Sequence, residues 1–204
     1  QLAGTALGDL IIGKSGNTST INVNSTLSVS DDISIYSGTL TIDSNIASSN
    51  SGSDILFSST SNIDINAPVT TSGASIVTIS SSNNVNDGST GGLTGKIVSD
   101  SLLLLGSGNF NLNSSTNNVS KLSSGSSGSR VGNLLFVNSG ALSIGSVATN
   151  NGVFASGTIS IATLSDDLLV SRNINTQNTS TSALILNAGQ STGSGTSTGG
   201  NINF

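Results

Sequence analysis

The stretches ISIYSGTLTIDSNI (residues 33–46) and ILFSSTSNIDINAPV (residues 55–69) decide the fold of this chain. Each contains three short hydrophobic segments in the same order, separated by polar residues. Within a segment the outer residues are apolar and are expected to point inward, while the middle residue points outward, as in a β-strand with one buried face. Two successive stretches of this kind predict two turns of a coil that is built from three short strands.

Short hydrophobic runs recur along the whole chain. They begin at Leu10, Ile33, Ile55, Ile76, Leu102, Leu134, Ile159 and Leu184, in steps of 23, 22, 21, 26, 32, 25 and 25 residues. A period of this size, carried by β-forming residues, is typical of a parallel β-helix, in which each coil buries its inward face by stacking on its neighbours. The sequence therefore predicts an all-β fold, a single-stranded parallel β-helix (β-solenoid) of about eight or nine coils of roughly 21–32 residues.

The core is expected to consist of the inward residues of these strands. They include Ile35, Ile42, Phe57, Ile65, Ile79, Leu104, Leu112, Phe136, Ile144, Ile161 and Leu186.

Residues 1–204 are expected to form a single elongated solenoid, because the repeat is unbroken and no change in composition marks a linker. The longest polar excursions, at 83–95 and 123–132, are interpreted as enlarged corners of the coil. Natural solenoids cover their terminal coils, but neither terminal stretch resembles a cap. We therefore expect a solenoid that is uncapped at both ends, either a segment of a longer β-helix or a filament subunit that stacks end to end on itself.

Composition excludes several classes of function. The chain is 34% hydrophobic and 7% charged, with a mean hydropathy of +0.16, which favours folding over disorder. It has no Cys and no His, so disulfides, cysteine metal sites and imidazole catalysis are excluded. A net charge of -5 argues against nucleic acid as a partner. No apolar stretch approaches the length of a membrane span, so membrane insertion is not expected.

The remaining candidates for chemistry are few. Asp31-Asp32 and Asp166-Asp167 are paired carboxylates, but neighbours in an extended strand point to opposite faces. The segment 84–88, Asn-Val-Asn-Asp-Gly, has oxygen ligands that suit calcium, yet it matches no calcium-loop pattern and is interpreted as a plain loop. The sequence therefore predicts no catalytic, cofactor-binding or metal-binding residue and no cofactor.

Asparagines near the strands are expected to stack as amide ladders with a structural role. The candidates are Asn22, Asn66, Asn111 and Asn175.

The phrases GTLTID (38–43), SNIDIN (61–66) and GTISIA (157–162) resemble the repeats of filamentous haemagglutinin-type bacterial surface proteins. The resemblance covers most of the chain. It implies a right-handed parallel β-helix that is exported to the bacterial cell surface or the extracellular space, where it works as a stalk, an adhesin or a matrix fibre.

Three functions follow as expectations. The first is a non-enzymatic structural repeat that gives an extracellular fibre or adhesin stalk its length and rigidity, with surface attachment or a biofilm matrix as its use. The second is a module that binds a glycan or a host surface through a lateral face or through the loop at 123–132. The third, and least favoured, is a polysaccharide-degrading β-helix enzyme, for which the basic residues are too scattered along the chain.

Overall fold

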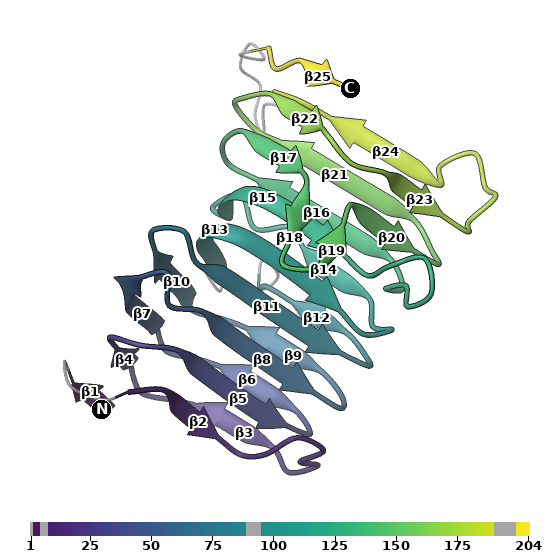
Figure 1. Ribbon diagram of the computed structural model, residues 1–204. Coiled ribbons are helices and arrows are strands. Elements are labelled where there is room, and N and C mark those ends of the chain that lie inside the picture. Colours follow the sequence, from purple (N-terminus) through teal and green to yellow (C-terminus); the bar gives the residue numbers. More distant parts are fainter. Residues whose placement is uncertain (1, 5–7, 89–94, 190–198) are drawn as a thin grey trace.

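The computed structural model describes residues 2–4, 8–88, 95–189 and 199–204. These residues form strands, turns and bends but no helix, and the strands stack into a parallel β-solenoid, from the N-terminal coil in purple to the C-terminal coil in yellow (Figure 1). The predicted fold class is therefore confirmed. Eight strands of one face mark about seven turns of the chain. The sequence prediction of eight or nine coils was higher because it counted the incomplete coils at both ends.

Three faces form the first half of the stack. Face I consists of β2 (Leu10–Ile12), β5 (Ile33–Ser37), β8 (Ile55–Ser59), β11 (Ile76–Ser81) and the second half of β13 (Lys96–Leu105). Face II consists of β3 (Ile21–Val23), β6 (Leu40–Ile42), β9 (Ile63–Ile65), β12 (Val85–Asn86), β14 (Phe110–Leu112), β16 (Leu134–Asn138), β21 (Ile159–Thr163) and β24 (Leu184–Asn187). Face III consists of β1 (Leu2–Gly4), β4 (Leu27–Val29), β7 (Ile46–Ser51), β10 (Pro68–Ser72), the first half of β13 and the start of β15 (Asn118–Ser124).

The second half of the stack has a different cross-section. Face I divides after β15, while face II continues unchanged. The divided face consists of β17 (Leu142–Ile144), β22 (Leu168–Val170) and β25 (Ile202–Asn203) on one side, and β20 (Val153–Ala155) and β23 (Ile174–Thr176) on the other. A short antiparallel hairpin, β18 (Ser146–Val147) and β19 (Asn150–Asn151), lies between the two sides in the chain.

Parallel register places the inward side chains of successive coils directly over one another. One row on face I runs through Leu10, Ile33, Ile55, Val77, Leu102, Leu122, Ile144 and Val170. Ten of the eleven inward residues predicted from the sequence are fully buried, and Leu186, in the last coil of face II, is half-buried. The predicted core is therefore confirmed, with its weakest burial where the stack ends.

The predicted phase of the repeat was wrong in the second half. The first five hydrophobic runs lie on face I, but those that begin at Leu134, Ile159 and Leu184 lie on face II. The reason is that Leu122 is the only large apolar residue in the face I part of β15, so its hydrophobic run is too short to recognise. The 32-residue step therefore joined two different faces, and the step along face II is 25 residues or fewer.

The enlarged corners also differ in detail. Ser123 and Ser124 belong to β15, so the second excursion begins at Gly125. The first excursion, 83–95, is not only a corner, because Val85–Asn86 form β12 of face II, and its residues 89–94 lie outside the described part of the chain. The β18–β19 hairpin was not predicted, because two strands of two residues each carry no periodic signal.

Face III ends where a side chain takes the place of a strand. Val119, near the start of β15, donates its N–H to Oδ1 of Asn138 at 2.9 Å and accepts a hydrogen bond from Nδ2 at 3.0 Å. Asn138 is fully buried, and its Nδ2 also contacts the carbonyl oxygens of Gly140 and Ala141. The amide thus satisfies the peptide groups that a further strand of face III would otherwise pair.

The first prediction concerns the inward row of face II. Ile65→Asp places a carboxylate in the packed core, and we expect the free energy of unfolding to fall by about 3 kcal/mol or more. Urea denaturation would measure this change. Thr78→Asp, at an outward position of β11, is the matched control and should cost about 0.5 kcal/mol or less. Equal effects of the two changes would mean that the inward and outward faces are wrongly assigned.

The second prediction concerns the end of face III. Asn138→Leu keeps the volume but leaves the Val119 peptide groups without partners, so we expect a loss of about 3 kcal/mol in thermal or urea unfolding. Asn111→Leu, on the outward side of β14, should change stability by about 0.5 kcal/mol or less. A stable Asn138→Leu variant would contradict the strand-replacing role of this amide.

Candidate functional site

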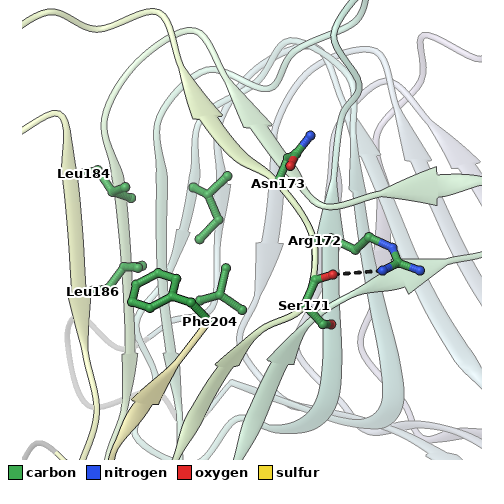
Figure 2. Close-up of a pocket in the computed structure, with 8 residues that line it drawn as sticks. Ser171, Arg172, Asn173, Leu184, Leu186 and Phe204 are labelled. Carbon is green, nitrogen blue, oxygen red and sulfur yellow. Dashed lines mark hydrogen bonds between the residues drawn. The ribbon is translucent and has the colours of Figure 1, made fainter.

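The C-terminal end of the stack is an open apolar surface. In β25, Ile202 pairs with Leu168 and Asn203 with Leu169, so Phe204 continues the inward row that ends at Val170. A pocket of about 420 Å³ lies on this end face, and Figure 2 shows the Phe204 ring beside Leu186 in it. Phe204 is 91% exposed. These residues occupy core positions, but no described residue covers them.

Polar groups form the rim of the same pocket. Arg172 donates from Nε to Oγ of Ser146 at 3.0 Å. It also donates from Nη1 to the carbonyl oxygen of Ser171 at 2.9 Å, a bond that Figure 2 shows. The end face therefore has an apolar centre and a hydrogen-bonded edge, the arrangement of a protein–protein interface.

The N-terminal end of the stack is open in the same way. A pocket of about 440 Å³ is lined by residues 21–27 together with Ile12. Ile11, on the outward side of β2, is 65% exposed, and Leu10, Ile12 and Ile21 are only half-buried. Both ends thus expose residues of the type that is fully buried in the middle of the stack.

The strands at both ends have free edges. In the described part of the chain, β1, β2 and β3 each pair with one strand only, and so do β23, β24 and β25. Unpaired N–H and C=O groups of such edges are ready to pair with a further strand. The two ends differ in cross-section, however, because the N-terminal end presents faces I, II and III, whereas the C-terminal end presents the divided face I and face II.

An asparagine ladder lies at the corner before face II, but its residues are not those predicted from the sequence. Four of its residues, Asn62, Asn84, Asn109 and Asn133, each directly precede a face II strand. Oδ1 of Asn62 accepts from the Asn84 N–H at 3.2 Å, and Oδ1 of Asn84 accepts from Nδ2 of Asn109 at 3.1 Å. Oδ1 of Asn109 then accepts from the N–H and Nδ2 of Asn133 at 2.9 and 3.0 Å.

The four predicted ladder residues do not stack on one another. Asn22 and Asn111 lie on face II with strands between them, Asn66 donates to Asp43 at 2.8 Å, and Asn175 lies in β23. The prediction of an amide ladder was correct in kind but wrong in its residues. The missed signal is that the residue just before each of four face II strands is Asn.

The paired carboxylates serve the backbone of the next coil. Oδ1 of Asp32 accepts from the Asp54 N–H at 2.8 Å, and Oδ1 of Asp54 accepts from the Ile76 N–H at 2.7 Å. Oδ1 of Asp167 accepts from the Asn201 N–H at 2.7 Å. Neither Asp31-Asp32 nor Asp166-Asp167 lines the pocket at either end of the stack or the pocket beside the β18–β19 hairpin. These carboxylates satisfy corner N–H groups.

The segment 84–88 does not gather its oxygen atoms around one point. Val85 and Asp87 are buried on the inner side of face II, while Asn86 points outward and donates to Oδ1 of Asp64 at 3.0 Å. Oδ2 of Asp87 accepts from the Ser114 N–H at 2.6 Å and from Nδ2 of Asn117 at 3.0 Å. Among the described residues there is no group of three or more acidic side chains that could hold a metal ion.

A lateral pocket lies beside the β18–β19 hairpin and has a volume of about 420 Å³. Its walls are the loop after β15, which provides Ser126 and Ser127, and the hairpin, which provides Thr149, Asn150 and Asn151. Phe154, on the outward side of β20, completes it. The loop at 123–132 was predicted from the sequence as a candidate binding segment, whereas the hairpin and Phe154 were not.

The fold places this chain in the class of parallel β-solenoid proteins. Comparison with protein-family models, with curated proteins and with solved structures gave no match in any of the three. Across the described ranges, no helix is long and apolar enough to cross a membrane.

The third prediction tests the observed ladder against the predicted one. Asn109→Ala removes hydrogen bonds to both neighbouring coils, and we expect it to lower the free energy of unfolding by about 1–2 kcal/mol. Asn22→Ala should change it by about 0.5 kcal/mol or less, because Asn22 is exposed in β3. Urea denaturation of both variants would measure these changes. A larger loss of stability in Asn22→Ala than in Asn109→Ala would favour the ladder predicted from the sequence.

Proposed function

We propose that this chain is a non-enzymatic structural repeat of an extracellular bacterial fibre or adhesin stalk, giving length, rigidity and surface attachment or a biofilm matrix. The observation that carries the proposal is the axial stacking of the coils, which pairs each inner coil with the coil before it and the coil after it. At both end faces, apolar rows and free strand edges face along the same axis. Exposed apolar surface and free edges promote association, so natural proteins usually cover them. A further coil, from the same chain or a neighbouring one, would cover both.

The arrangement of the core supports a mechanical role. Each inner coil pairs with the coil before it and the coil after it, and the hydrogen bonds of all three faces run along the axis of the stack. Pulling along this axis loads many hydrogen bonds and packed side chains together. Stability in such a stack arises from interfaces between neighbouring repeats, so a longer stack is also a more stable one.

The extracellular location rests on the resemblance of GTLTID (38–43), SNIDIN (61–66) and GTISIA (157–162) to filamentous haemagglutinin-type repeats. The absence of Cys and His is compatible with this assignment. Its partner would be itself, in tandem repeats or end-to-end stacking, and neither nucleic acid nor the membrane interior is proposed.

The two ends of the stack differ in cross-section, which restricts how identical copies can stack on each other. Face III reaches the N-terminal end of the stack but stops at Asn138, well before the C-terminal end. When one copy stacks on another, the face III edge therefore finds no partner strand. A further coil with the same divided face I would offer a partner strand to each strand at the C-terminal end of the stack.

The enzymatic alternative is less favoured. A polysaccharide-degrading enzyme needs carboxyl groups or basic side chains converging on a cleft. In each Asp pair one carboxylate, that of Asp32 or Asp167, instead accepts a hydrogen bond from a corner N–H group. The alternative of a glycan- or host-surface-binding module is favoured by the lateral pocket with Phe154.

The fourth prediction tests the end face. Leu184, in the last coil, and Leu169, on the lateral surface of β22, are both 45% exposed. We expect the purified chain to form rods that associate through their ends, and Leu184→Lys should weaken this association because it places a charge on the apolar end face. Leu169→Lys, with the same exposure, should leave it unchanged.

Electron microscopy and sedimentation velocity of the purified chain would measure rod shape and association. Filaments with an axial repeat of one chain length would indicate end-to-end stacking, and single rods would contradict the expected association. Association that persists in Leu184→Lys and disappears in Leu169→Lys would contradict the proposal, since contact would then be lateral.

A further inference from the structure

The lateral pocket has walls that are fixed to the rod. The hairpin β18–β19 lies against the outer side of β13 and β15. Leu103 points outward from β13 and yet is only 5% exposed, and Val147 of the hairpin is also buried. The Gly152 N–H donates to the carbonyl oxygen of Gly145 at 2.9 Å and closes the base of the hairpin. The hairpin is therefore packed against the rod and does not project from it as a free loop.

The opposite wall is joined to the hairpin. Nδ2 of Asn150 donates to the carbonyl oxygen of Gly125 at 2.6 Å, which connects the hairpin with the loop after β15. The loop is itself closed by a turn, in which the Ser126 N–H donates to the Ser129 carbonyl oxygen at 2.8 Å. The two walls are held at a fixed separation, so the pocket is preformed. Preformed pockets lose little free energy to ordering when a ligand binds.

Phe154 differs from the three phenylalanines of the core. Phe57, Phe110 and Phe136 are fully buried, whereas Phe154 occupies an outward position of β20 and lines the pocket. The Arg130 guanidinium carbon lies 5.6 Å from the centroid of its ring. Arg130 is in turn fixed, because Nη1 donates to the carbonyl oxygens of Ala155 and Asn175, both at 3.2 Å. The ring is thus held in place from one side by a cation–π contact.

The polar groups around the ring are hydroxyls and amides. Ser127 and Thr149 are exposed, and their hydroxyls make no hydrogen bond to any described residue. Asn150 uses Nδ2 for the bond to Gly125 in the loop, and Asn151 uses Oδ1 to accept from Ser146 within the hairpin. This leaves Oδ1 of Asn150 and Nδ2 of Asn151 for a ligand. An aromatic ring with donors and acceptors at its edge suits a ligand that has one apolar face and a rim of hydroxyls. A sugar ring has this chemistry.

We propose that the pocket between the β18–β19 hairpin and the loop after β15 binds an uncharged hexose or N-acetylhexosamine unit of a glycan. The apolar face of the sugar packs on Phe154, and its hydroxyls bond to Ser127, Thr149 and the two asparagines. The proposed ligand is neutral because no charged side chain lines the pocket. This site is independent of the coil stacking and the end faces that support the structural proposal.

The fifth prediction uses the two outward aromatic residues as a matched pair. The probes are cellotriose, maltotriose, N-acetylchitotriose and, as the charged comparison, trigalacturonate, titrated into the purified chain by calorimetry or ligand-observed NMR. We expect at least one uncharged probe to bind, and Phe154→Ala to weaken it about tenfold or more. Tyr36→Ala, on β5 in the first half of the rod, should leave the affinity unchanged.

A second variant avoids dependence on the packing of Phe154. Thr149→Val keeps the shape of an exposed residue but removes its hydroxyl, and we expect about a threefold loss of affinity with an unchanged melting temperature. Between about 50 and 500 mM NaCl the affinity for an uncharged probe should stay nearly constant, because salt screens only charged contacts.

Three results would overturn the proposal. The first is no binding of any uncharged probe with a Kd below about 10 mM. The second is binding that Phe154→Ala and Thr149→Val leave intact. The third is tighter, salt-sensitive binding of trigalacturonate, which would make the site one for acidic glycans. None of these results affects the end-face proposal, because rod formation and end-to-end association are measured separately.

Discussion

In-register parallel pairing between coils is the constraint on which the rest of the structure depends. Because each strand meets its equivalent in the next coil, like positions stack on like, and eight aliphatic side chains from Leu10 to Val170 form one continuous row. The same rule acts on polar residues, so that asparagines at one corner become a ladder and aspartates at another accept hydrogen bonds from the coil above. Packing and polar satisfaction both follow from one repeated geometry.

The sequence predicted the fold class and most of the core because inward and outward positions alternate strictly within each strand. The sequence did not show that the hydrophobic runs of the second half lie on face II and not on face I. Leu122 is surrounded by small and polar residues in β15, so the face I strand there has no recognisable hydrophobic run. The prediction from the sequence also misplaced the amide ladder, whose members are defined by the residue before a strand and thus need accurate strand boundaries. Phe154 was missed for the same reason. Its outward direction is known only once Val153 and Ala155 are known to point inward.

Two buried polar sites mark where the regular pattern changes. Asp87 occupies an inward position of face II between Ile65 and Leu112, where it binds Ser114 and Asn117, and Asn117 in turn accepts from the Ile97 N–H at 2.8 Å. Asn138 repeats this device at Val119 and ends face III. A buried amide can replace strand pairing because it carries the same donor and acceptor as a peptide group, and a buried carboxylate can replace the acceptor. The hydropathy of the sequence does not reveal such buried polar residues, because a polar residue at an inward position has the same hydropathy as a polar residue at a corner of the coil.

The change of cross-section at Asn138 has a consequence for how the chain reaches its native state. Repetitive sequences risk folding out of register, because a coil displaced by one full repeat still stacks aliphatic on aliphatic. Coils on the two sides of Asn138 are not interchangeable, and a slipped chain would leave the Val119 peptide groups buried without partners. The irregularity therefore widens the energy gap between the native alignment and its shifted competitors. A perfectly uniform solenoid would have no such landmark and would depend on its termini alone to set the alignment.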